Sequence, residues 1–380
     1  MKKVVCLILT ALLLTGALFA AGGKDAQSAN SAEVTNLLKK YFPNQMKDGA
    51  VRIAVVRNLN PGDHTQQFLD GCVSEGRALG FEVDTFVTNG DNVLCQQTLE
   101  QVINNGQKNY DGIILSHGEG GYTYNALKPA VDKGMKVVTF DSVPYPNGDI
   151  TKPILTGVTS TAQEDFKLAE LSLSSIVENF PGKQPVKVIR AWMGPGIPPL
   201  DRRQTIYDRY VKEGKIQEIA LIGPVNASDP RGGTRDAMAA VLPRFAPGAV
   251  DAIWGSYDEL AKGALDALND AKRTDIKLMS IDISNDDINL MLDYPAVWVS
   301  TGAVDPKLIG IADMRLLAAK FAGESTPDTY NLDAQSVKTT QLNRSINMTN
   351  IVSVVPGWGQ EQGVYDTYAW FKEIKAALKK

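Results

Sequence analysis

Short apolar segments alternate with amphipathic segments along this chain, and the whole alternation occurs twice. Apolar runs of strand length separated by helical periods predict parallel strands joined by right-handed helical crossovers. The expected strands are 51–56, 81–87, 112–115 and 135–141 in the first half, and 186–192, 216–222, 249–254 and 276–282 in the second. The fold class is therefore expected to be α/β, with two doubly wound parallel-sheet lobes.

The last strand of each half ends on an aspartate. Asp141 follows the apolar run 137–140, and Asp282 follows the run 278–281. In a parallel sheet, ligands bind outside the carboxyl ends of the strands. Two lobes that each offer a carboxylate at this edge indicate a small polar ligand held between them. The alternative is that both aspartates only cap helices or form turns.

Segments rich in proline and glycine separate the two halves, and we expect the chain to pass between the lobes in three hinge segments. These are 153–157, 301–304 and the strand around 337–341. The predicted first lobe is 50–156 plus 304–335, and the predicted second lobe is 157–303 plus 336–355. A further strand at 351–355 and a tail helix within 356–380, over 364–378, complete the predicted organisation.

The first 22 residues indicate export. Met1-Lys2-Lys3 is basic, the following residues are almost all apolar up to residue 17, and small residues follow Phe19. This pattern is typical of a secretory signal peptide. Ala21-Gly22 stands where a lipidation motif would need a cysteine, so we expect a soluble exported protein. A retained N-terminal anchor is the alternative, and 23–49 is expected to be a linker and N-terminal segment.

Composition excludes several function classes. A net charge of −4 without basic clusters argues against nucleic acid as a partner. Only two histidines occur, which excludes a multi-histidine metal site. The chain lacks a phosphate-binding loop, a Gly-x-Ser-x-Gly motif, and zinc or calcium spacing. We therefore predict no catalytic residues, no metal and no cofactor. An exported hydrolase, which would need carboxylates but shows no motif, is the enzyme alternative.

Two cysteines, Cys72 and Cys95, follow the signal segment. An exported protein could join them in a disulfide. They fall on consecutive helices, which a doubly wound fold places on opposite faces of the sheet. Two buried thiols are therefore the favoured interpretation.

Other candidate ligand contacts lie at the same sheet edges. His64 follows the first strand, His117 follows the third, and Tyr257 follows a strand of the second half. Arg203 lies early in a helix, where a cation is mildly unfavourable, so another interaction is expected to hold it there. Trp192 ends a strand and is expected either to stack on a sugar ring or to belong to the core. The alternative to ligand contact for each histidine is that it is a solvated loop residue or caps a helix.

The chain resembles periplasmic sugar-binding proteins of ABC importers, of the ribose- and galactose-binding type of class I solute-binding protein. The similarity spans roughly residues 52–321. The segments that carry it are Arg52-Ile53-Ala54-Val55-Val56 with Asp70-Gly71, the run ending at Asp141, Arg203 with Tyr207, Asp258-Glu259-Leu260-Ala261, and Ser280-Ile281-Asp282.

The resemblance implies two lobes joined by a three-strand hinge that close on a monosaccharide. It implies ligand contacts at Asp141, Arg203 and Asp282, with Tyr257 at a position that commonly holds asparagine. In the loop after the first strand it implies Asn60 as a contact. His64 and Thr65 lie near the places of a usual aromatic clamp, and Ala303 or Val304 replaces a usual glutamine. These departures point away from ribose and galactose themselves.

The predicted function is that of an exported, monomeric solute-binding protein in the periplasm. It would capture a small sugar or polyol in an interlobe cleft and deliver it to a membrane ABC permease. The alternative is a ligand sensor of the same fold that presents its closed form to a chemoreceptor or sensor kinase. A cytoplasmic repressor of this fold would need an N-terminal helix-turn-helix, and the predicted signal peptide stands in its place.

Overall fold

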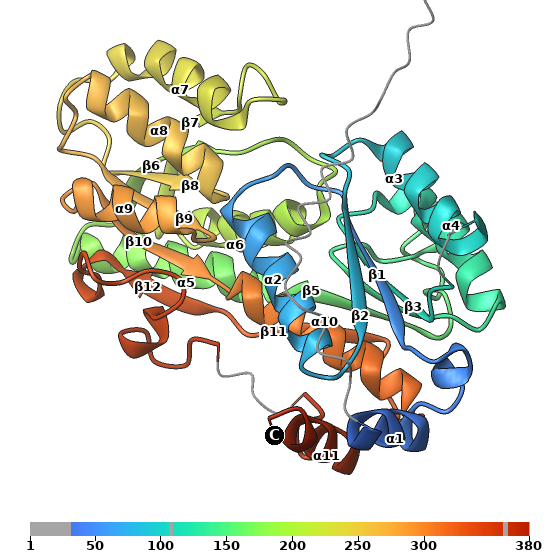
Figure 1. The fold of residues 1–380 in the computed structure, drawn as a ribbon. Helices are drawn as coiled ribbons and strands as arrows, with labels where there is room; N and C mark the ends of the chain where they lie inside the picture. The colour runs from blue at the N-terminus through green and yellow to red at the C-terminus, as the bar shows by residue number, and fades with distance from the viewer. Residues whose placement is uncertain (1–31, 106–108, 360–363, 380) are drawn as a thin grey trace, which may run out of the picture.

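A computed structural model describes residues 32–105, 109–359 and 364–379 as two α/β lobes (Figure 1). The predicted signal peptide, residues 1–22, lies outside the described residues. No helix within the described residues is long and apolar enough to cross a membrane.

The first lobe is built on a six-stranded sheet in the order β11-β5-β4-β3-β1-β2, with every neighbouring pair parallel. Helices cover both faces: α2 and α10 pack on one, and α3 and α4 on the other. The strands are β1 Arg52–Arg57, β2 Glu82–Val87, β3 Gly112–Ser116, β4 Lys136–Phe140, β5 Val158–Gln163 and β11 Thr329–Leu332. The helices are α2 Asp63–Arg77, α3 Asn92–Glu100, α4 Gly120–Asp132 and α10 Pro306–Phe321.

The second lobe repeats the design on a sheet in the order β12-β10-β9-β8-β6-β7, whose edge strand β12 is antiparallel to β10. Helices α5 and α6 cover one face, and α7, α8 and α9 the other. The strands are β6 Val186–Ala191, β7 Ile216–Ile222, β8 Ala252–Gly255, β9 Lys277–Ile281, β10 Trp298–Ala303 and β12 Gln335–Lys338. The helices are α5 Asp165–Asn179, α6 Pro198–Lys212, α7 Pro230–Val241, α8 Asp258–Asp270 and α9 Asn285–Asp293. The predicted pair of doubly wound lobes is confirmed.

The chain passes from one sheet to the other at three places, and two of them differ from the prediction. The first crossing follows β5, at Glu164, so residues 158–163 belong to the first lobe and not to the second. This strand was missed because its sequence is polar. Its hydroxyls bond inside the lobe: Ser160 Oγ accepts from Thr139 Oγ1 at 2.9 Å, and Thr161 Oγ1 donates to Asp313 at 2.7 Å.

The second crossing, between β10 and α10, falls within the predicted segment 301–304 and the residue after it. The third lies between β11 and β12, at residues 333–334, ahead of the predicted 337–341. Each lobe therefore receives one strand from the final part of the chain.

The two ends of the described chain pack together on the first lobe. Helix α1, Ala32–Tyr41, forms within the predicted linker and lies beside α11, Ala369–Ala377 (Figure 1). Phe42 and Trp370 meet edge to face with ring centroids 6.1 Å apart, and Lys40 pairs with Glu373 at 3.0 Å. The tail helix begins later than predicted.

The segment before α11 packs on the second lobe instead. Residues 342–358 bury Ile346, Ile351, Val355 and Trp358 in its core. The strand predicted at 351–355 is wrong: Ile351–Ser353 is one turn of 3₁₀ helix.

Cys72 and Cys95 are buried free thiols in cores on opposite faces of the first sheet. This arrangement agrees with the favoured interpretation of the sequence.

Candidate ligand-binding site

Three strands end in a residue whose backbone is left-handed. His117 follows β3 with φ 60°, Asp141 follows β4 with φ 48°, and Asp282 follows β9 with φ 72°. Each backbone N–H still donates to the neighbouring strand, to the carbonyls of Phe140, Thr161 and Gly302 respectively. Residues other than glycine are uncommon in this conformation, which concentrates at functional sites. The same turn thus sets three polar side chains at the carboxyl edges of the sheets.

The first-lobe wall of the site is organised around Arg57. This last residue of β1 is wholly buried, and its guanidinium lies 4.6 Å from the ring centre of Phe68. It reaches His64 Nδ1 at 2.8 Å, Ser116 Oγ at 2.6 Å and His117 Nδ1 at 3.2 Å. Arg57 therefore brings the two predicted histidines to one place.

The second-lobe wall is organised around Asp165, the first residue of α5. Its buried carboxylate accepts from Arg202 Nη2 at 2.6 Å and from Arg203 Nε at 2.8 Å. Arg203 Nη1 also donates to the carbonyl of Ser256 at 2.8 Å and to Asp282 Oδ2 at 3.3 Å. The two predicted residues of this lobe, Arg203 and Asp282, are thus held in one network.

The two walls meet. Arg202 Nη2 of the second lobe lies 3.8 Å from Asp141 Oδ1 of the first. At the rim, Asp63 Oδ2 accepts from the backbone N–H of Asn285, at the start of α9, at 2.6 Å. The structure therefore shows the lobes in contact around the predicted aspartates.

Several buried polar atoms at the carboxyl edges of the two sheets make no hydrogen bond within the described residues. They include Asp141 Oδ1, which Arg202 Nη2 approaches only to 3.8 Å, and Arg57 Nε, Trp192 Nε1 and Ser256 Oγ. Leaving such a group unsatisfied costs about 1–3 kcal/mol, and more for a charged group. The Trp192 ring is half-buried and lies 4.8 Å from the Arg190 guanidinium, so its side chain is held in place. The atoms that would complete the site are an acceptor for Trp192 and a donor for Asp141.

Burial shifts the pKa values of the acids and of the histidines in opposite directions. It raises the pKa of Asp141 to about 7, with the charge of Asp165 adding to the effect, and it raises the pKa of Asp282 to about 6. Burial, with the charges of Arg57 and Arg203, lowers the pKa of His64 to about 3, and the pKa of His117 is also well below its usual value. His64 is therefore not expected to titrate near neutral pH.

The remaining two predicted residues differ in placement. Tyr257 precedes α8 and is half-buried, and its hydroxyl pKa is raised by burial and by the charges of Asp258, Glu259 and Asp282. Asn60 is exposed in the loop after β1, where its carbonyl accepts from Thr65 Oγ1. None of the contacts found in the described residues joins the Asn60 side chain to the site.

Sequence reasoning missed Arg57, Asp165 and Arg202. A signal for Arg57 was available, because a charged residue closes an otherwise apolar buried strand. Asp165 gave no such signal, since an acidic residue in the first turn of a helix is common.

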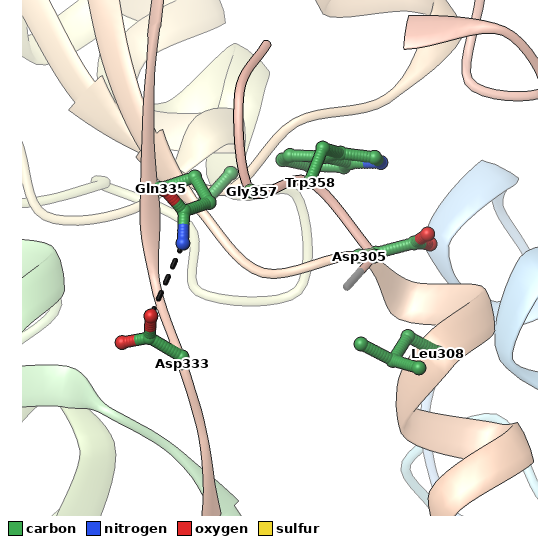
Figure 2. A pocket seen from close by; sticks show the side chains of 8 residues that line it. Asp305, Leu308, Asp333, Gln335, Gly357 and Trp358 are labelled. Atoms are coloured by element: carbon green, nitrogen blue, oxygen red, sulfur yellow. Dashed lines mark hydrogen bonds between the residues drawn. The ribbon is translucent and has the colours of Figure 1, made fainter. Parts of the chain in front are cut away.

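A separate cavity of about 180 Å³ lies beside the hinge crossings (Figure 2). Its carboxylates and its amide have partners within the described residues: Gln335 Nε2 donates to Asp333 Oδ2 at 3.1 Å, and Asp305 Oδ1 accepts from the N–H of Lys307 at 2.9 Å. Trp358 and Leu308 supply its apolar lining. We assign this cavity to the hinge.

Two lobes that meet over polar, incompletely paired side chains define a solute-binding protein. The chain belongs to the periplasmic binding protein family, because residues 53–325 match the periplasmic binding protein domain. Members of this family are non-enzymatic binding components of ABC transporters, which confirms the prediction that this chain is not an enzyme. No match was found among curated proteins.

Several solved structures resemble this one. A sugar ABC transporter protein from Yersinia enterocolitica subsp. enterocolitica 8081 is 39% identical, with 90% of this chain and 97% of that chain covered and a TM-score of 0.77. The 5-methylthioribose transporter solute-binding protein from Thermotoga lettingae TMO, solved with 5-methylthioribose, is 28% identical, with 86% and 97% covered and a TM-score of 0.73. A solute-binding protein from Agrobacterium vitis, solved with allitol, shares the fold at 19% identity, with 80% and 98% covered and a TM-score of 0.66.

Proposed function

We propose that this protein binds one small neutral sugar or polyol between its lobes and delivers it, in the periplasm, to an ABC import permease. The observation that carries the proposal is the buried Asp141 Oδ1 at the junction of the two walls, which makes no hydrogen bond although Arg202 Nη2 lies 3.8 Å away. A ligand hydroxyl is the donor that this oxygen lacks.

The charges of the site favour a neutral ligand. Among the site residues described above, the guanidinium groups of Arg57, Arg202 and Arg203 are matched in number by the carboxylates of Asp141, Asp165 and Asp282. An anionic ligand would meet three carboxylates, and a cationic ligand three guanidinium groups, with no net charge to compensate either.

Hydroxyl groups match what the walls offer. Each hydroxyl both donates and accepts, so it can pair with a carboxylate and a guanidinium at the same time. The half-buried Trp192 adds an aromatic surface for the C–H face of a ring and an N–H for an oxygen. The contacts we propose are Asp141, His64 and His117 from the first lobe. From the second lobe they are Asp282, Arg202, Trp192 and Tyr257.

The relative solved with 5-methylthioribose puts pentoses and their 5-substituted derivatives first among the ligands to test. Hexoses, their deoxy forms and linear polyols come next. An amino acid and a dipeptide serve as ligands of the wrong chemistry.

Thermal shift and titration calorimetry on the mature chain test the proposal. A ligand at about 100 times its Kd stabilises the folded protein by about 2.7 kcal/mol, which a melting curve resolves. We expect one polyhydroxylated compound to stabilise the protein and to bind with a stoichiometry of one. Tight binding of the amino acid or dipeptide, with no response to any sugar or polyol, would contradict the proposal.

Delivery to a permease is tested separately in cells. Deleting the gene should abolish uptake of the radiolabelled ligand, and restoring the intact chain should rescue it. Unchanged uptake in the deletion strain would show that this protein is not required for import, even if it binds the ligand.

A further inference from the structure

Both histidines of this chain contact the same buried guanidinium. The sequence contains only two, His64 and His117, and Arg57 lies between their Nδ1 atoms at 2.8 Å and 3.2 Å. Arg57 has no exposed surface, and the ring centres of Phe68 and Phe140 lie 4.6 Å and 5.9 Å from it. The guanidinium is therefore fixed before any ligand arrives.

The chemistry of arginine decides which nitrogen of each imidazole carries the hydrogen. A guanidinium has five N–H donors and no acceptor, so each Nδ1 that faces it must accept. Ser116 Oγ supports this assignment: it accepts from Arg57 Nη1 at 2.6 Å and lies 2.8 Å from His117 Nδ1, to which its own hydrogen can be donated. A neutral imidazole that accepts at Nδ1 has its hydrogen on Nε2.

The two Nε2 atoms remain available. Within the described residues, neither makes a hydrogen bond to the protein, and neither is among the enclosed atoms that lack partners. Both rings are only half-buried, although Arg57 behind them is wholly buried. The imidazoles thus form a surface layer over a buried cation.

We propose that Arg57 is a positioning residue that holds both histidines as neutral Nε2–H tautomers, so that the first lobe presents two N–H donors beside the Asp141 acceptor. The ligand must then turn two acceptor oxygens, from hydroxyl, ether or ring positions, toward this wall. This assignment of ligand atoms rests on the proposed function, whereas the tautomers themselves do not.

The surroundings of the pair oppose protonation. His64, on α2, faces Arg57 of β1 and Arg203 of α6, and His117 faces Arg57 and His64. Arg57 in turn faces Asp141 after β4, Asp313 on α10 and Cys72 on α2. Burial and the nearby guanidinium charges both favour neutral imidazoles. The carboxylates of Asp141 and Asp313 act on the charge of Arg57 and not on the histidines.

Two histidines per chain make nuclear magnetic resonance of ¹⁵N-histidine-labelled, ligand-free protein a direct test. We expect both residues to show the Nε2–H tautomer and no protonation between about pH 5 and about pH 8. An Nδ1–H tautomer at either residue, or a midpoint near the ordinary histidine pKa of about 6.5, would overturn the proposal. This measurement needs no ligand and no variant.

A variant pair tests the role of Arg57. Arg57→Gln should release at least one imidazole, which would then give mixed tautomers or titrate between about pH 5 and pH 7. Arg52→Gln is the matched control, because Arg52 begins the same strand and pairs with Asp48 and Glu82 away from the site. Both spectra should be unchanged in the control. If Arg57→Gln folds and its histidines behave as in the wild type, Arg57 is not the positioning residue.

The ligand side is tested once a sugar is known. Single-deoxy forms of that sugar identify the oxygen that faces His64: losing it should weaken binding about tenfold in the wild type and much less in His64→Phe. Equal penalties in the two proteins for every deoxy form would refute the donor role, even if the tautomers are as expected. Failure of all sugars to bind would refute the proposed function and leave the tautomer result standing.

Discussion

The two lobes use the same backbone turn at the end of a central strand but surround it with different chemistry. Asp141 and Asp282 have the same left-handed conformation and the same bond to the next strand. Around Asp141 the wall consists of a buried arginine covered by two imidazoles. Around Asp282 it consists of two arginines on one buried carboxylate, with Tyr257 nearby. The backbone thus sets where the carboxylates stand, and the neighbouring side chains set what each lobe offers a ligand.

The comparison also shows how each lobe tolerates a buried charge. In the first lobe, aromatic rings and neutral acceptors surround Arg57, and Asp141 Oδ1 makes no hydrogen bond. In the second lobe, opposite charges pair directly through Asp165. We therefore expect the second lobe to be more sensitive to loss of a charge, and the first to be more sensitive to pH.

The largest effect is expected from Asp165→Ala. It removes the closer of the two carboxylates that pair with buried Arg203 and leaves only Asp282 at 3.3 Å. Breaking such a buried pair typically costs about 3–5 kcal/mol. Urea unfolding measures the loss, and ligand binding should be lost as well because Arg202 and Arg203 are no longer held.

The matched control is Asp270→Ala, whose carboxylate pairs with Arg235 on the surface of the same lobe at 2.7 Å. An exposed pair contributes about 0–1 kcal/mol. If the two alanine variants lose similar stability, the second lobe does not depend on the Asp165 network.

Asn substitutions of the two equivalent aspartates come next. Asp141→Asn and Asp282→Asn keep the side-chain shape and the left-handed turn, but each removes a charged acceptor. We expect each to weaken binding by roughly 1.5–3 kcal/mol in calorimetry, with an unchanged circular dichroism spectrum. Stability should separate them: Asp282→Asn should destabilise the protein through Arg203, and Asp141→Asn should not. Wild-type affinity in either variant would make that aspartate a turn residue only.

The pH dependence should come from Asp141 and not from His64. Burial raises the pKa of Asp141 from 3.8 to about 7, so its contribution to the stability of the ligand-free protein is lost as the pH rises from about 4 to about 7. A ligand hydroxyl favours the ionised form. Affinity is therefore expected to be nearly full at about pH 8, about half of that at pH 7 and about tenfold lower at pH 6.

Calorimetry across this range in wild type, Asp141→Asn and His64→Phe identifies the group. In Asp141→Asn the dependence should shrink to the small part that Asp282, with a pKa of about 6, contributes, and it should persist in full in His64→Phe. A pH dependence that is lost in His64→Phe and kept in Asp141→Asn would show that His64 is the titrating group.

The smallest effect is expected at the rim, where the lobes touch. Asp63→Ala removes the acceptor for the Asn285 N–H at the start of α9 and should weaken the closed form by about 0.5–1.5 kcal/mol. Affinity should fall a few-fold, with little change in unfolding. Asp70→Ala, an exposed residue on the same helix whose carboxylate accepts from Gln66, is the control. Equal affinities for the two variants would show that this contact does not favour closure.

Much of the fold and part of the site follow from local sequence pattern. The alternation of strands and helices predicted both sheets, because each strand buries apolar side chains and shows them in its own sequence. The position of a residue just after such a strand was enough to bring Asp141, Asp282, His64 and His117 to the sheet edges. The unfavourable position of the Arg203 cation at the start of its helix singled this residue out, and the family resemblance implied the same contact. In the structure, Arg203 donates to Asp282.

Tertiary structure alone decided the rest, because the deciding contacts join segments far apart in the chain. Strand β5 is polar, and its hydroxyls find their partners in other segments of the first lobe: Ser160 accepts from Thr139, and Thr161 donates to Asp313. Helices α1 and α11 pack against each other on the first lobe, a contact between the two ends of the described chain. The protonation of the histidines depends on the buried charge of Arg57, which the fold brings beside them. The sequence around each histidine does not show which charge will be buried next to it.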